Sequence, residues 1–77
     1  MLKELVLYIA KSLVDKPEEV SITEIENEHS NILELRVVKE DLGKVIGKQG
    51  RTARAIRTVL AAASSKAQKR TALEIID

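Results

Sequence analysis

The 77-residue sequence contains no cysteine, tryptophan or phenylalanine, and Tyr8 is its only aromatic residue. Without cysteine the chain can form neither disulfides nor thiolate metal sites. The one histidine, His29, cannot build a metal site alone, so we expect no metal and no cofactor. The core must consist of Leu, Ile, Val and Ala, and in one small domain spanning residues 1–77 such a core leaves a small stability margin.

Long hydrophobic runs are also missing from the sequence. No uninterrupted apolar stretch approaches the roughly 20 residues that cross a bilayer. The apolar start of the chain is interrupted by Lys3, Glu4 and Lys11, and no small-residue cleavage site follows it, which indicates a helix rather than a signal peptide. We therefore expect a soluble, cytoplasmic protein with no membrane partner.

The net charge of +1 conceals a strong separation of charge along the chain. Residues 15–41 hold nine acidic and three basic side chains, a net charge of −6. Residues 42–70 hold eight basic side chains and no acidic one, a net charge of +8. Basic runs are often only solvated helix surface. The alternative interpretation is a face that binds an anion such as nucleic acid.

The first 16 residues have the apolar spacing of one helix face. The residues of that predicted face are Leu2, Leu5, Val6, Ile9 and Leu13. Proline disfavours helical geometry in the residue before it, so we expect the helix to end by Lys16, ahead of Pro17.

Residues 20–38 alternate apolar and polar side chains, which predicts two strands. The polar residues 27–31 between them predict a turn, so the strands should form an antiparallel hairpin. Ile25 is out of phase with Ile22, and a bulge near Thr23 or Glu24 would restore the alternation.

Two helices and a strand are predicted for the remainder. Glu40 and Asp41 open a short helix, which Gly47 ends, and the acids lie where the helix dipole favours them. Its apolar residues are Leu42, Val45 and Ile46. A longer helix from Arg51 has Val59 at the edge of an inward face formed by Ala53, Ile56, Leu60, Ala63 and Ala67. Residues 72–76 close the chain as a strand.

These elements follow the order αββααβ and define an α+β fold. Two helices connect the second strand to the last one, and such crossovers join parallel neighbours. We therefore predict a three-stranded mixed sheet covered on one face by three helices, with Glu34, Arg36 and Glu74 pointing to water on the other.

The most informative segment is GKVIGKQGRTARAIR, residues 43–57, in which a Gly-x-x-Gly loop links the two helices. Glycine tolerates positive φ and lets another backbone approach closely. Unpaired amides and the dipole at the start of the following helix attract phosphate, and Lys48, Arg51 and Arg54 add full positive charges. A Gly-x-x-Gly match alone is weak, but its place between two helices in a basic segment of this fold is specific.

The segment VIGKQGRTARAIRTV, the preceding hairpin and the closing LEIID resemble type II KH domains, most closely the small bacterial KhpA (YlqC) family. The resemblance implies an RNA chaperone or post-transcriptional regulator, with a role in cell shape, that clamps about four nucleotides of single-stranded RNA. The residues so implied are Gly43, Lys44, Val45, Ile46, Gly47, Lys48, Gln49, Gly50, Arg51, Ala53 and Arg54. Val45, Ile46, Ala53 and part of the second strand would form the groove floor, and Ala53 is smaller than the aliphatic residue common there.

Two other classes of function compete with RNA binding. An enzyme is not expected, because the glycine spacing differs from that of phosphate-binding loops and His29 is remote from any nucleophile. A protein-interaction module is the stronger alternative, since Ala55, Ala61 and Ala62 lie outside the predicted inward face. The resemblance also implies a homodimer and pairing with a larger KH protein of the KhpB (Jag, EloR) type.

Overall fold

The computed structural model describes residues 2–67 and 69–77. The N-terminal half consists of helix α1 (Leu2–Leu13), a 3-10 turn (Pro17–Glu19) and a hairpin of the strands β1 (Ser21–Glu26) and β2 (Ser30–Arg36). The second half consists of a 3-10 turn at Lys39–Asp41, α2 Leu42–Ile46, a 3-10 turn at Lys48–Gly50, α3 Arg51–Ala67 and β3 Arg70–Ile76. The predicted α+β class and the order αββααβ are confirmed.

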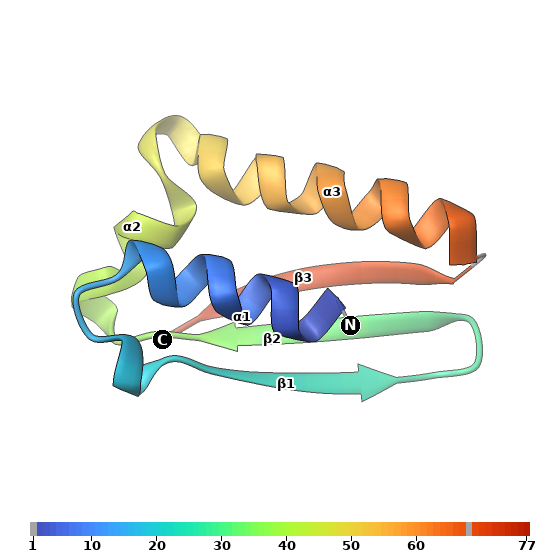
Figure 1. Cartoon of the computed structure of the whole chain (residues 1–77), viewed down its shortest axis with the longest axis horizontal. Coiled ribbons are helices and arrows are strands. Elements are labelled where there is room, and N and C mark those ends of the chain that lie inside the picture. The colour runs from blue at the N-terminus through green and yellow to red at the C-terminus, as the bar shows by residue number, and fades with distance from the viewer. Residues whose placement is uncertain (1, 68) are drawn as a thin grey trace.

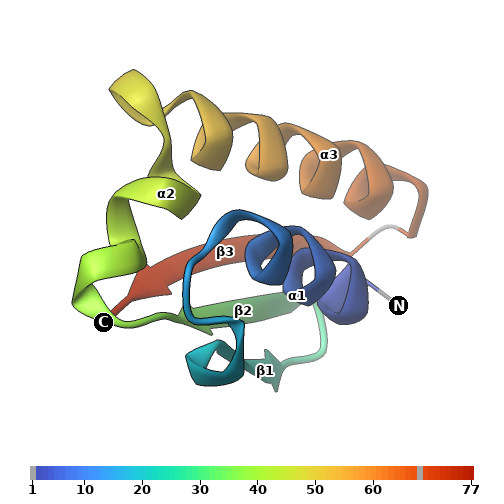
Figure 2. The same cartoon turned by 60° about the vertical axis from the view of Figure 1, so that its left-hand side comes forward.

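The three strands form one mixed sheet in the order β1-β2-β3. β1 pairs with β2 in antiparallel fashion and β3 pairs with β2 in parallel fashion, as the hairpin and the helical crossover predicted. Figures 1 and 2 show α1, α2 and α3 on the same side of this sheet, while the other face is uncovered. β3 is therefore an edge strand that lies under α3.

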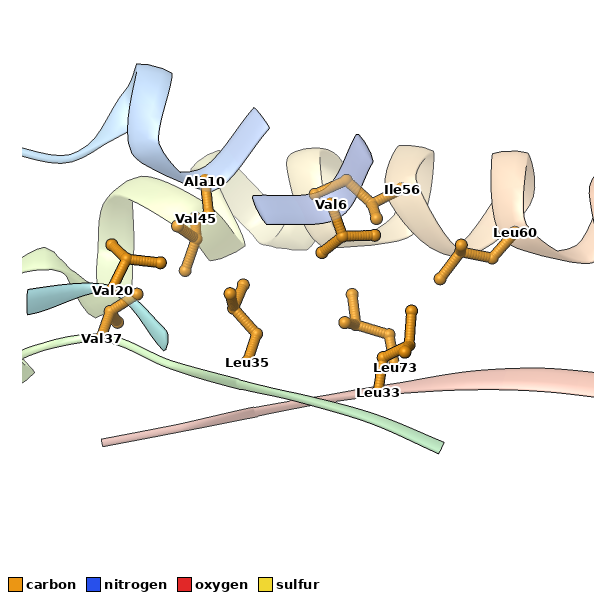
Figure 3. Packing of buried hydrophobic residues seen from close by; sticks show 10 residues of the cluster. All are labelled: Val6, Ala10, Val20, Leu33, Leu35, Val37, Val45, Ile56, Leu60 and Leu73. Carbon is orange, nitrogen blue, oxygen red and sulfur yellow. The ribbon is translucent and has the colours of Figure 1, made fainter. Parts of the chain in front are cut away.

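The hydrophobic core lies between the sheet and the helices (Figure 3). Leu33 and Leu35 of the central strand are its middle, with 1% and 0% of their surfaces exposed. The other members shown are Val6, Ala10, Val20, Val37, Val45, Ile56, Leu60 and Leu73. This core contains no ring, in agreement with the composition.

The buried face of α1 differs in part from the predicted one. Val6 and Ala10 are its fully buried residues, whereas Leu5 and Leu13 are each 40% exposed. Leu2 and Ile9 pack against the core from its margin. The small side chain of Ala10 lets α1 approach the sheet closely, which apolar spacing alone did not indicate.

The predicted bulge in the first strand is wrong. Pairing runs without interruption from Ser21 opposite Arg36 to Glu26 opposite Asn31. Ile25 therefore lies on the uncovered face of the sheet, paired with Ile32, and is 40% exposed. The hydrogen bonds of the regular β1–β2 pairing stabilise the fold more than the partial exposure of Ile25 destabilises it.

The inward face of α3 is confirmed for its buried residues. Ala53, Ile56 and Leu60 are 3%, 5% and 1% exposed. Val59, which was predicted at the edge, is 48% exposed. The side chains of Lys66 and Ala67 lie outside the described residues. None of the helices within the described ranges is long and apolar enough to cross a membrane.

Candidate nucleic-acid interface

In the loop between α2 and α3, three of the four residues 47–50 have a positive φ. Gly47 ends α2 with φ of 80°, and Gly50 has φ of 75°. Gln49, a residue with a side chain, also adopts a positive φ of 58°. The Gly47 N–H donates to the Gly43 carbonyl at 2.9 Å, and the Gly50 N–H donates to the Gly47 carbonyl at 3.1 Å. This tight turn leaves the Lys48 and Gln49 side chains exposed.

Gly47 also makes the close approach for which a glycine is required. A Cβ atom there would collide with the Thr52 side chain and lie 2.8 Å from the Thr52 backbone nitrogen. A Cβ at Gly50 would meet nothing within 4 Å. The loop is therefore held against the first turn of α3 at Gly47. At Gly50, glycine is favoured only because of the positive φ.

Positive charge surrounds this turn. Lys48, Arg51 and Arg54 are exposed, and no acidic residue occurs between positions 42 and 70. The Arg51 guanidinium approaches the Gln49 side-chain oxygen at 3.5 Å, a long and weak contact that leaves it available to a ligand. The loop leads into the N-terminus of α3, where the helix dipole adds partial positive charge and the Arg51 N–H donates to the Lys48 carbonyl. Together these groups can hold a phosphate.

Two residues of the N-terminal segment anchor α2. The buried carboxylate of Asp41 accepts the backbone N–H groups of Asp15 and Lys16 at 3.3 and 3.0 Å. Lys44, a predicted RNA contact, forms an ion pair with Asp15 at 3.2 Å. We expected Asp41 only to favour the helix dipole. Its contacts lie at least 25 residues away in the sequence, and no local pattern indicates them.

The aliphatic residues predicted for the groove floor are unequal in exposure. Val45 and Ala53 are 0% and 3% exposed, so they support the loop from the core, while Ile46 is half-buried. The second strand, β2, is central, and its helix-facing residues Leu33 and Leu35 are completely buried. A contribution of β2 to the groove floor stays a prediction, and the strand with a free edge beside α3 is β3.

The sequence analysis missed a contact between α3 and that edge strand. The Arg57 guanidinium donates to the Leu73 carbonyl at 3.3 Å. The Arg70 N–H and the Ile76 carbonyl bond toward β2, so the backbone groups of the alternate residues Thr71, Leu73 and Ile75 face the free edge. Arg57 satisfies one of these groups and fixes one flank of α3 above β3.

Comparisons with known proteins agree with this geometry. The family model described as "KhpA/KhpB, KH domain" matches residues 3–75. A protein of Clostridium perfringens named RNA-binding protein KhpA is 63% identical over 75 residues, 97% of this chain and 100% of that protein. A protein of the same name from Treponema pallidum is 57% identical over 77 residues, 100% of this chain and 96% of that protein.

A third protein named RNA-binding protein KhpA, from Clostridium acetobutylicum, is 60% identical over 75 residues, 97% of this chain and 100% of that protein. No solved structure matches the chain. The family match and these relatives cover nearly every residue, including the hairpin, the loop and the closing strand. The chain belongs to the KhpA/KhpB family of KH domains.

Proposed function

We propose that this protein binds single-stranded RNA by clamping its backbone on the Gly47-Lys48-Gln49-Gly50 loop, without catalysis. The observation that carries the proposal is the tight left-handed turn, with two exposed side chains at its tip and arginines at the start of α3. The printed names of the relatives, RNA-binding protein KhpA, support it. We place this activity in the cytoplasm, as an RNA chaperone or post-transcriptional regulator.

The clamp acts through backbone and charge. Phosphate oxygens lie at the positive end of the α3 dipole, and Lys48, Arg51 and Arg54 neutralise their charge. Bases splay out beside Ile46, which favours single strands over duplexes. For single strands, each neutralised phosphate contributes about −0.7 to the slope of the logarithm of the association constant against the logarithm of the salt concentration. Three such contacts imply a slope of roughly −2.

The double variant Lys48→Asp and Gln49→Asp tests the clamp. It places negative charge at the tip of the loop, so RNA binding should be lost while circular dichroism and the melting temperature stay unchanged. A matched control is Lys11→Asp with Ser12→Asp on exposed positions of α1, which alters net charge by the same amount. Binding of an unstructured oligonucleotide by the loop variant at wild-type strength would show that the clamp assignment is wrong.

A second function, association with another KH protein, is favoured by the exposed strip on α3. Ala55, Val59 and Ala62 are spaced as neighbours on one helix flank, and all three are exposed. At about 100° per residue, Ala61 belongs to a different flank of α3. The alanines Ala55, Ala61 and Ala62 therefore do not form one surface. We propose that the strip joins two copies of the chain, or one copy to a KhpB-type protein.

A further inference from the structure

A hollow of about 380 Å³ lies where α3 ends and β3 begins, far along the helix from the loop. It is lined by Ala61, Ser64, Ser65, Lys69, Arg70 and Thr71. The polar side chains of the described lining residues are hydroxyls and cations, with no carboxylate among them. The Lys69 ammonium is already paired with Glu26 at 2.7 Å, and the exposed Arg70 is the other cation among the described lining residues.

The Ser64 hydroxyl beside this hollow is buried without a partner. The residue is 7% exposed, and its Oγ makes no hydrogen bond within residues 2–67 and 69–77. Two other helix hydroxyls behave differently: Ser12 and Thr58 donate to the carbonyls of Tyr8 and Arg54 at 2.8 and 3.0 Å. An unpaired buried hydroxyl costs stability. A group that enters the hollow could supply the missing hydrogen bond.

The hollow lies on the same flank of α3 as the arginines that follow the loop. Arg54, Arg57, Ala61 and Ser64 are spaced by three or four residues, which places them along one side of a helix. The Arg57 bond to Leu73 holds this side against β3 near its middle, and residues of both segments line the hollow near its end. We call this side, from Arg54 to Ser64, the α3–β3 seam.

We propose that RNA continues from the loop along the α3–β3 seam and that the hollow receives one of its nucleotides. This inference rests on the proposed function. The rise from Arg51 to Ser64 is about 20 Å, which six nucleotides cover at the ~3.4 Å spacing of a stacked strand. With about four nucleotides at the clamp, the full site accommodates about ten.

The chemistry of the hollow suits a ribose and its phosphate. The Ser64 and Thr71 hydroxyls can each donate and accept a hydrogen bond, as the ribose 2′-hydroxyl requires. Arg70 at the rim can pair with the phosphate through its planar guanidinium. The exposed Ala61 leaves the entrance open, because a longer side chain at this position would fill it.

The test compares an unstructured oligonucleotide of about four nucleotides with one of about ten, by fluorescence anisotropy. Arg70→Gln should weaken binding of the longer RNA roughly fivefold, as expected for one exposed phosphate contact. Ala61→Leu should also weaken it, because the larger side chain fills the entrance, and neither variant should change binding of the shorter RNA. Lys11→Gln is the matched control, since it removes one exposed cation from α1 and should affect both lengths equally.

Wild-type binding of the longer RNA by both variants would overturn the proposal. Equal losses for both lengths would also overturn it, because the hollow would then act only through overall charge or stability. Failure of the proposed function gives a different result: the loop variant with Lys48→Asp and Gln49→Asp would then bind RNA of both lengths as strongly as the wild type.

Discussion

At the scale of single residues, the three glycines of the loop region have different structural roles. Gly47 has a positive φ and lies against Thr52, Gly50 has a positive φ with open space around it, and Gly43 has neither constraint. The fold therefore requires glycine strictly at Gly47, less strictly at Gly50, and not at Gly43. Only an approaching ligand would benefit from the missing side chain at Gly43, which lies in the helix before the clamp.

Alanine substitution should reproduce this order in urea denaturation. Gly50→Ala should cost about 1 to 2 kcal/mol for the left-handed conformation, and Gly47→Ala more than that because of the added collision. Gly43→Ala should be neutral or stabilise the fold by up to ~1 kcal/mol, through helix propensity. A Gly43→Ala variant as unstable as Gly47→Ala would contradict this assignment. Weaker RNA binding by a stable Gly43→Ala protein would place the RNA backbone beside α2.

Asp41 joins the segment that follows α1 to the start of α2. Replacing it with alanine leaves the backbone N–H groups of Asp15 and Lys16 without their acceptor. We expect Asp41→Ala to lower stability by about 1 to 3 kcal/mol, which is roughly 4 to 8 °C in melting temperature for each kcal/mol in a domain of this size. The neighbouring exposed Glu40→Ala is the control and should melt like wild type. Equal melting of the two variants would show that the buried carboxylate does not stabilise the fold.

At the scale of elements, an ion pair connects the hairpin to the junction between α3 and β3. The Lys69 ammonium donates to the Glu26 carboxylate at 2.7 Å. This hydrogen bond, with the accompanying Coulomb attraction, lowers the pKa of Glu26 below its ordinary value. Because the folded pKa is the lower one, the contribution to stability is present at neutral pH and is lost as the pH falls through the folded pKa.

An NMR titration of the Glu26 carboxyl group measures this contact directly. In the wild type the pKa should lie below the ordinary value, and in Lys69→Met it should return toward that value. The control Lys39→Met removes a cation from the 3-10 turn Lys39–Asp41 and should leave the Glu26 titration unchanged. An unshifted wild-type pKa would mean that the two side chains do not pair in solution.

At the scale of the whole molecule, the small core and the exposed strip on α3 favour self-association. Val59 at the centre of the strip is 48% exposed, and burial of its side chain would add to a core that has no aromatic residue. Two copies related by a twofold axis would bring two loops into one assembly, so that one RNA could engage both with a gain in avidity.

Analytical ultracentrifugation at micromolar concentration tests this arrangement. Ala62→Glu places a charge within the strip and should produce a monomer with a lower melting temperature, whereas Ala61→Glu lies on the α3–β3 seam and should remain dimeric. A dimeric Ala62→Glu protein would place the interface elsewhere. A monomeric wild type would remove the dimer hypothesis itself.

The sequence by itself determined the element order, the hairpin, the parallel return of the last strand and the loop with its cations. Each depends on local features: the 3.6- and 2-residue periods, the turn residues 27–29 and the glycines at 47 and 50. Such patterns act over a few residues, so they can be interpreted without knowledge of the fold.

Only the tertiary structure decided which residues meet across long separations. The Asp41 contacts with the N-terminal segment, the Arg57 bond to the edge of β3 and the Ser64 hollow join segments that periodicity cannot relate. The same holds for the bulge, since the exposure of Ile25 depended on ladder hydrogen bonds with β2. Helical spacing alone places Ala61 and Ala62 on different flanks of α3, but only the packing against β3 shows which of these flanks remains free. Packing selects one partner among many of similar polarity, and a single sequence carries no local signal for that choice.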